Sequence, residues 1–135
     1  MSVAQIETRP KVLCIDDDPA IIAALGTRLR EFNVELFTAF FGTQGIWLAV
    51  TERPDVIITD IRMPSGHGDY TVECLKRRPD TCEIPVIVLS GQRDGRMKRK
   101  MLALGVQRYL CKPISLQHVV NAIERFINLR PLTTV

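Results

Sequence analysis

The sequence has little that would direct it to a membrane, to nucleic acid or out of the cell. No apolar run in its 135 residues approaches membrane-spanning length, and the polar segment 1–10 lacks the apolar core of a signal peptide. The net charge of +3 is too small to indicate nucleic acid by itself. We therefore expect a cytoplasmic protein without membrane contact, and we do not expect DNA binding.

The cysteines lack the spacing of a zinc site or of a redox pair. The four are Cys14, Cys74, Cys82 and Cys111. No two of them form a C-x-x-C motif, and their spacing from His67 and His118 matches no usual zinc site. We interpret the cysteines as buried free thiols in a reducing compartment.

Short apolar runs alternate with helix-like segments along a chain long enough for one domain with a hydrophobic core. Strands are predicted at 12–15, 34–37, 56–59, 85–89 and 109–111. Helices are predicted after Asp18, from Gly42 to before Pro54, over 70–77 and 95–104, and after Ser115. Five βα units predict an α/β fold, a doubly wound parallel sheet with helices on both faces.

Three of these helices have an apolar face that we expect to be buried. The faces are Ile22, Leu25, Leu29 and Phe32 in the first helix, Ile46, Trp47 and Val50 in the second, and Leu116, Val119, Val120, Ile123 and Ile127 in the last. Gly105 is predicted to end the fourth helix.

Polar residues stand at the carboxyl ends of four predicted strands. They are Asp16, Asp17 and Asp18 after the first strand, Asp60 after the third, Ser90 after the fourth and Lys112 after the fifth. Ligands of open parallel sheets bind outside the carboxyl ends of the strands, so these residues are predicted to meet in one crevice.

The chemistry of this set points to a divalent cation and a phosphoryl group. Two carboxylates about 4 Å apart repel by roughly 4 kcal/mol at an effective dielectric constant of 20, so clustered aspartates need a cation. Magnesium prefers oxygen ligands, and an aspartate beside it can act as a nucleophile. Lys112 would neutralise the oxygens of a transferring phosphoryl group, and the Ser90 hydroxyl can donate to one of them.

Together these motifs resemble the receiver domain of bacterial two-component response regulators. The matching segments are IDDDP at 15–19, DIRMP at 60–64 with Gly68, LSG at 89–91 and YLCKP at 109–113. The resemblance covers residues 10–130 and leaves 1–9 and 131–135 as tails. It implies the flavodoxin-like strand order 2-1-3-4-5.

The resemblance also implies residue roles. Asp60 would accept a phosphoryl group from a phosphohistidine on a sensor histidine kinase or a histidine phosphotransfer protein. The implied ligands of Mg²⁺ are Asp16, Asp17, Asp60 and the backbone carbonyl of Arg62, while Ser90 and Lys112 would contact the phosphoryl oxygens. Such a domain is a signalling switch rather than an enzyme, since it catalyses only its own phosphorylation and dephosphorylation.

Two further pairs of residues follow from the resemblance. Ser90 would move toward the phosphoryl group while Tyr109 turns inward behind it, which would remodel the surface of the fourth helix, fifth strand and fifth helix. That surface would meet a downstream protein target or an output domain. Tyr109 as a plain half-buried strand residue remains the alternative. Arg62 and Gln92 depart from the commonest family members, and we hypothesise that they tune the lifetime of phosphorylated Asp60.

The fourth predicted helix lies in a basic segment. Residues 92–112 hold seven lysines and arginines and one aspartate, a net charge of +6, or +5 without Lys112. This charge indicates either a solvated helix face or a docking surface for an acidic partner. No recognition helix accompanies it, which argues against DNA binding.

Two other functions compete with a stand-alone receiver. The chain can be the receiver portion of a longer transcription regulator or hybrid kinase. It also has features of a haloacid dehalogenase-type phosphatase, with Asp16 as nucleophile and Asp18 as general acid and base. That phosphatase needs an acidic pair after Lys112, where Glu124 is the only acidic residue, and it leaves Asp60 unexplained.

Overall fold

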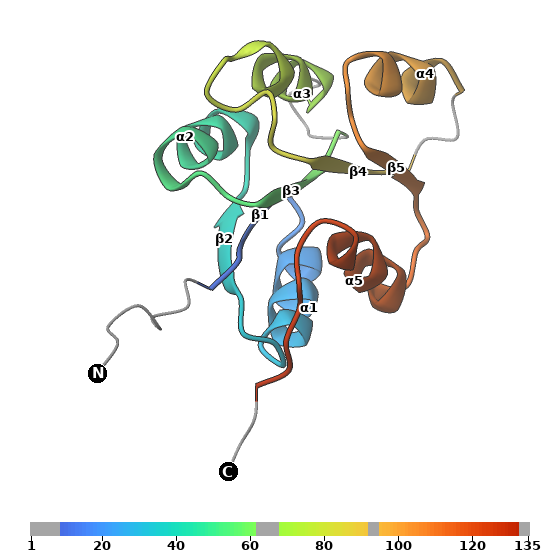
Figure 1. Ribbon diagram of the computed structural model, residues 1–135. Coiled ribbons are helices and arrows are strands. Elements are labelled where there is room, and N and C mark those ends of the chain that lie inside the picture. Colours follow the sequence, from blue (N-terminus) through green and yellow to red (C-terminus); the bar gives the residue numbers. More distant parts are fainter. Residues whose placement is uncertain (1–8, 62–67, 92–94, 133–135) are drawn as a thin grey trace.

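The computed structural model describes residues 9–61, 68–91 and 95–132. Five parallel strands form one sheet in the order β2-β1-β3-β4-β5 (Figure 1). The strands are β1 Lys11–Ile15, β2 Glu35–Ala39, β3 Val56–Asp60, β4 Val86–Ser90 and β5 Arg108–Cys111. This order confirms the predicted flavodoxin-like fold, and each strand lies within two residues of its prediction.

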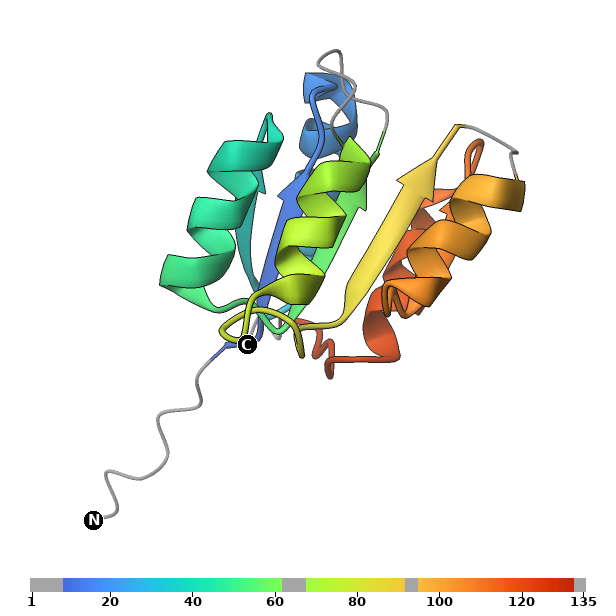
Figure 2. The ribbon, with the colours of Figure 1, turned by 90° about the horizontal axis from the view of Figure 1, so that it is seen from above.

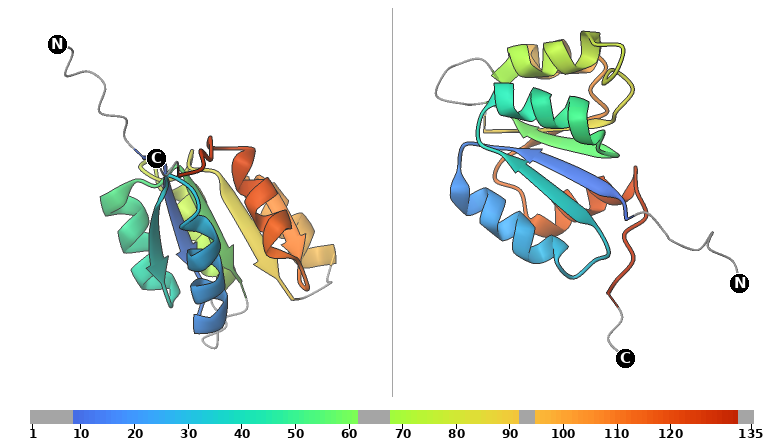
Figure 3. Two further views of the ribbon diagram at one scale, coloured as in Figure 1. Left: turned by 90° about the horizontal axis from the view of Figure 1, so that it is seen from below. Right: turned by 90° about the vertical axis from the view of Figure 1, so that its left-hand side faces the viewer.

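Five helices cover the two faces of the sheet. They are α1 Pro19–Leu29, α2 Gly42–Glu52, α3 Gly68–Arg77, α4 Gly95–Ala103 and α5 Leu116–Glu124. Helices α2, α3 and α4 lie side by side on one face (Figure 2). Helices α1 and α5 cover the other face, as the left view of Figure 3 shows. Each face has its own hydrophobic core, and β3 and β4 are buried along their whole length between the two.

Local sequence signals set several helix ends as predicted. The Asp18 side chain caps α1 by accepting from the Ala20 N–H at 2.9 Å. The Ser115 hydroxyl oxygen caps α5 by accepting from the His118 N–H at 3.2 Å. Gly105 follows α4 with a φ of 102°, a conformation that suits glycine best.

Two predicted core residues are exposed instead. Trp47 lies on the outer side of α2, because the inward positions of this helix are Gly45 and Ala49. A Cβ atom on Gly45 would lie 2.3 Å from Cδ1 of Ile15, so the close approach of α2 to β1 fixes the rotation of the helix. Leu116 is exposed in the first turn of α5, whose buried face begins one turn later.

The prediction of buried thiols is correct for Cys14 only. All four cysteines are free, but Cys74 and Cys82 are half-buried and Cys111 is exposed. Cys111 ends β5, a strand at the edge of the sheet that has a neighbour on one side only. Among the described residues no helix has the length and apolar character needed to span a membrane.

Candidate functional site

The predicted acidic residues meet at the carboxyl ends of the two central strands. Asp16 follows β1 and Asp60 ends β3, and these strands are paired with Ile15 opposite Thr59. The N–H of Asp16 donates to the carbonyl of Ala39 at 2.9 Å, which holds the start of the acidic turn against the end of β2. One carboxylate oxygen each from Asp16, Asp17 and Asp60 lies within 4.8 Å of the others.

Lys112 brings a positive charge to this cluster from the edge of the sheet. Its Nζ lies 3.2 Å from Oδ2 of Asp60 and 3.6 Å from Oδ2 of Asp16. The backbone N–H of Lys112 donates to the carbonyl of Ser90 at 2.7 Å, so the end of β4 positions the residue. The peptide bond between Lys112 and Pro113 is cis.

The site is buried and electrostatically unbalanced. The side chains of Asp16 and Asp60 are 2% and 7% exposed, and Lys112 is 25% exposed. Two charges 4.8 Å apart interact by roughly 3.5 kcal/mol at an effective dielectric constant of 20, and here three carboxylates face one ammonium among the described residues. Burial raises the pKa of Asp16 above its ordinary value, although the Asp18 N–H and Lys112 oppose the shift. The oxygen donors and the excess negative charge fit a bound Mg²⁺ ion.

The other predicted site residues have distinct environments. Ser90 is fully buried and directly follows Leu89, the residue opposite Asp60 in the sheet. Tyr109 packs into the core on the side of α4, and its buried hydroxyl has no hydrogen-bond partner among the described residues. Asp18 is exposed and caps α1, which accounts for this residue without a catalytic role.

Some predictions lie outside the described residues. They concern the backbone carbonyl of Arg62 and the tuning roles of Arg62 and Gln92.

The structure also explains Gly68, a residue of the matching motif to which the sequence alone gave no role. A Cβ atom on Gly68 would lie 2.1 Å from the carbonyl oxygen of Ile61, so only glycine fits where α3 begins beside the end of β3.

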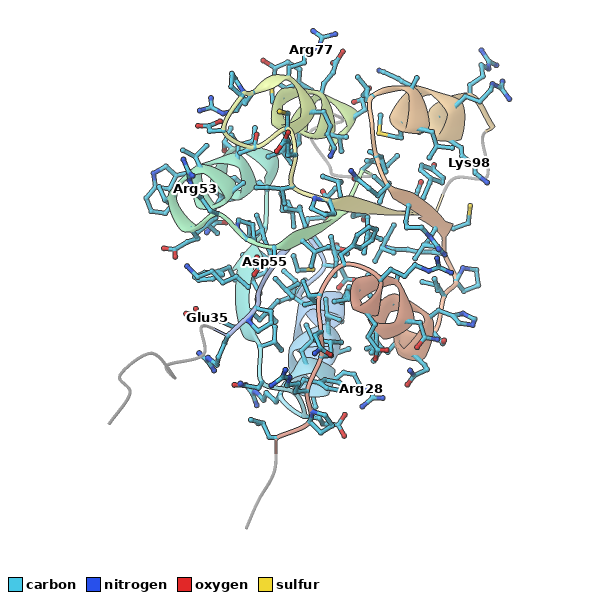
Figure 4. All side chains as sticks on the ribbon, viewed as in Figure 1. Arg28, Glu35, Arg53, Asp55, Arg77 and Lys98 are labelled. Carbon is cyan, nitrogen blue, oxygen red and sulfur yellow. The ribbon has the colours of Figure 1, made fainter. Side chains whose placement is uncertain are left out.

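Helix α4 presents the predicted basic surface. Lys98 and Arg99 are exposed and form no ion pair with a described residue, whereas Lys100 binds Asp69 of α3 at 2.8 Å. Figure 4 shows Lys98 on α4 and Arg77 on α3 at the outer surface of the molecule.

Comparison with known families gives one decisive match. The model of the response regulator receiver domain matches residues 12–124. This chain belongs to the receiver domain family. Receiver domains are phosphoacceptors and signalling switches of two-component systems rather than conventional enzymes, and they pair with histidine kinases. An acidic cluster like that of Asp16, Asp17 and Asp60 is typical of their magnesium site.

Individual relatives agree with this membership. The chain is 33% identical over 126 residues to the transcriptional regulatory protein PrrA of Mycobacterium tuberculosis, covering 93% of this chain and 53% of the relative. It is 30% identical over 129 residues to the hybrid signal transduction histidine kinase D of Dictyostelium discoideum, covering 96% of this chain and 8% of the relative. The chain therefore spans only about half or less of these longer proteins.

Solved receiver structures match over almost their full length. The Vibrio cholerae chemotaxis protein CheY4 has a TM-score of 0.81 and 26% identity, covering 89% of this chain and 100% of that protein. The receiver domain of Francisella response regulator 1452 has a TM-score of 0.78 and 30% identity, covering 87% of this chain and 96% of that domain.

Proposed function

We propose that Asp60 is the residue that accepts the phosphoryl group. The observation that carries this proposal is the position of Asp60, which belongs to the carboxylate cluster and lies 3.2 Å from the ammonium group of Lys112. Asp16 has the deeper and less accessible side chain, and its Oδ1 already accepts the Asp18 N–H at 2.9 Å. Asp60 is therefore better suited than Asp16 to receive a group from outside.

The proposed reaction is an in-line transfer from a phosphohistidine. A carboxylate oxygen of Asp60 attacks phosphorus, the P–N bond breaks, and the imidazole nitrogen keeps the electron pair and takes a proton from solvent. The product is an acyl phosphate on Asp60. Catalysis here consists mainly of positioning and of neutralising the phosphoryl oxygens, which is the role that we assign to Lys112 and to the Ser90 hydroxyl.

The acidic cluster would hold Mg²⁺ through Asp16, Asp17, Asp60 and the backbone carbonyl of Arg62. When bound, this ion supplies charge neutralisation for the carboxylates and the incoming phosphoryl group. The protein's own contribution is the fixed spacing of the carboxylates at the ends of β1 and β3.

Further roles remain part of the proposal. Ser90 and Tyr109 would form the switch, and the surface of α4, β5 and α5 would contact a downstream protein target or output domain. The buried hydroxyl of Tyr109 has no hydrogen-bond partner in the described part of the chain, which supports a second stable arrangement of this side chain. Arg62 and Gln92 would tune the phosphoryl lifetime, so Arg62→Asn should change the rate of autodephosphorylation, and an unchanged rate would remove this idea.

The boundaries and partners are proposed as follows. Residues 10–130 form the receiver, and a sensor histidine kinase or histidine phosphotransfer protein is the donor. Relatives that are transcription regulators or hybrid kinases support the alternative that the receiver works inside a longer protein. No described feature favours the phosphatase alternative, because Asp18 is accounted for as a helix cap.

Intact mass after incubation with acetyl phosphate and magnesium tests the assignment. We expect one phosphoryl adduct on the wild type, no adduct on Asp60→Ala, and a matched control, Asp55→Ala at the other end of β3, that behaves as the wild type. An adduct that persists in Asp60→Ala and disappears in Asp16→Ala would overturn the assignment in favour of Asp16.

A further inference from the structure

Helix α4 is attached to the rest of the protein by few buried side chains. Met101 is its only buried residue, and Met97 is half-buried. The structure describes all five helices along their whole length, and each of the other four buries at least two residues. Because buried contacts hold a helix to its sheet, the position of α4 depends more than that of the other helices on single interactions.

One such interaction joins α4 to α3, its neighbour on the same face of the sheet. Nζ of Lys100 donates to Oδ2 of Asp69 at 2.8 Å, and we call this contact the α3–α4 ion pair. The hydrogen bond from Lys100 lowers the pKa of Asp69, and the same bond raises the pKa of Lys100, so both groups are charged at neutral pH. By contrast, the ion pair between Arg77 and Glu73 lies within α3 and joins no second element.

Asp69 is held close to the phosphoryl-accepting site by the residue that precedes it. A Cβ atom on Gly68 would lie 2.1 Å from the carbonyl oxygen of Ile61, so the start of α3 packs against the backbone that directly follows Asp60. Asp69 therefore belongs to a part of the fold whose place is set by the end of β3. The α3–α4 ion pair joins the helix with the fewest buried side chains to this part.

Tyr109 lies on the face of the sheet that α4 covers. It is 8% exposed and belongs to the same hydrophobic cluster as Met97 and Met101. Its buried hydroxyl has no hydrogen-bond partner in the described part of the chain, and a buried polar group without a partner costs free energy. The inward position of Tyr109 therefore depends on other contacts, among them a helix α4 that stays in place over this cluster.

We propose that the α3–α4 ion pair stabilises the arrangement in which Tyr109 is inward, and that it thereby favours binding of the phosphoryl group at Asp60. This role rests on the function proposed above, in which phosphorylation of Asp60 and the inward position of Tyr109 belong to the same state of the switch. An interaction present in only one of two states shifts the equilibrium toward that state. It raises the affinity of a ligand that prefers this state by up to the same factor.

The test measures how tightly beryllofluoride binds in the presence of magnesium. This tetrahedral anion coordinates a carboxylate oxygen and takes the place of a phosphoryl group. Its affinity is measured as the concentration that halves the initial rate of labelling by acetyl phosphate, which is followed by intact mass.

The variants remove the α3–α4 ion pair from either side. They are Lys100→Met, Asp69→Asn and the two together, while Lys100→Arg keeps the positive charge. The matched control is Lys98→Met, because Lys98 is exposed on the same helix and forms no ion pair with a described residue. The control therefore removes the same charge from α4 without breaking a contact to α3.

We expect Lys100→Met and Asp69→Asn each to weaken beryllofluoride binding about two- to fivefold, and the double variant to bind as either single variant does. Lys100→Met lowers the net charge and Asp69→Asn raises it, so a general effect of charge on an anion would move the two affinities in opposite directions. Lys100→Arg and the control Lys98→Met should match the wild type. In about 1 M salt the differences should shrink, because both side chains of the pair are partly exposed.

Equal affinity of wild type, Lys100→Met and Asp69→Asn for beryllofluoride would overturn this role of the ion pair. Changes in opposite directions would assign the effect to net charge, and a double variant with the product of the two single effects would show that the residues act independently. Either result would also contradict the proposal. If acetyl phosphate does not label the wild type at all, the proposed function fails, and the role of the ion pair fails with it.

Discussion

The two ends of the sheet are built differently, although the same five strands run between them. At the carboxyl ends, the carboxylates of Asp16, Asp17 and Asp60 lie close together, and the ammonium of Lys112 is paired with Asp16 and Asp60. At the amino ends, charged side chains have partners. Oδ2 of Asp55 accepts the backbone N–H of Lys11 at 2.7 Å, and Nζ of Lys11 donates to the carbonyl of Glu52 at 3.2 Å and lies 3.6 Å from Oε2 of the same residue.

Two lysines, Lys76 and Lys112, show the same contrast between the ends of the sheet. Nζ of Lys76 donates to the carbonyls of Cys82 and Ile84 at 3.3 and 2.9 Å and to Oε1 of Gln107 at 3.2 Å. This lysine joins α3 to the segments that lead into β4 and β5. Lys112, in contrast, joins no backbone carbonyl through its ammonium in the described residues and faces carboxylates. One end of this fold is therefore organised for stability and the other for binding charge.

The largest effect is expected when Lys112 is replaced by methionine, and the same replacement of Lys76 is the matched control. Lys112→Met should slow labelling by acetyl phosphate about 100-fold, because it removes the cation that neutralises the phosphoryl oxygens. Lys76→Met should leave labelling unchanged and lower the free energy of unfolding by about 1–2 kcal/mol, since its hydrogen bonds are lost while the cost of burying its charge is relieved. Labelling kinetics and urea unfolding measure the two effects. Equal slowing in both variants would contradict the comparison.

The next largest effect is expected in the free energy of unfolding when a buried carboxylate at the carboxyl ends of the strands loses its charge. In EDTA at neutral pH, Asp16→Asn should raise the free energy of unfolding by about 1–2 kcal/mol, because it removes a buried like charge and keeps an oxygen for the Asp18 N–H. The control Asp55→Asn should change stability by no more than about 0.5 kcal/mol.

Asp16→Asn should also change how the free energy of unfolding depends on pH. The pKa of Asp16 is raised in the folded state, so the folded protein binds this proton more readily than the unfolded chain. The wild type should therefore lose stability as pH rises from the ordinary pKa of an aspartate through the raised value. Asp16→Asn should lack this loss in urea unfolding between those pH values. A variant less stable than the wild type at neutral pH would refute the expectation.

A smaller effect is expected at the N-cap of α2. Phe41→Ser should raise the free energy of unfolding by about 1 kcal/mol, because serine can accept a free N–H in the first turn. Phe41→Ala removes the ring without adding a cap and should bring no such gain. Thermal or urea unfolding of both variants separates capping from loss of the ring, and identical stabilities would exclude the capping argument.

The smallest effect on the free energy of unfolding is expected at the amino end of the sheet. This end is not built for stability throughout, because it also contains a residue with an unfavourable backbone conformation. Arg53 follows α2 with a φ of 50°, a left-handed conformation that is unfavourable for a residue with a side chain. Arg53→Gly should raise the free energy of unfolding by about 0.5 kcal/mol, after the entropy of glycine in the unfolded chain is included. Arg53→Ala should give no gain. Figure 4 labels Arg53 and Asp55, which lie in the segment between α2 and β3.

Much of the fold and site could be predicted from the sequence, because the signals are local. Apolar β-branched runs mark the buried strands, and Asp18, Ser115 and Gly105 act on the helix end next to them. The site follows from the rule that carboxyl ends of parallel strands share one edge, which brought Asp60 and Lys112 together.

The parts that could not be predicted depend on how elements pack. Trp47 fits an apolar helical face by its spacing, but the close approach of Gly45 to Ile15 turns that position outward. Cys111 follows a strand-like run, but its strand lies at the sheet edge.

The site at which the phosphoryl group is attached tests the role of Asp60 most directly. After labelling with acetyl phosphate and magnesium, peptide mass spectrometry can locate the modified side chain. We predict a single phosphoryl group on the carboxylate of Asp60. A phosphoryl group on Asp16 or Asp17 would contradict the account, because it would place the acceptor on the acidic turn after β1 and leave Asp60 without its proposed role.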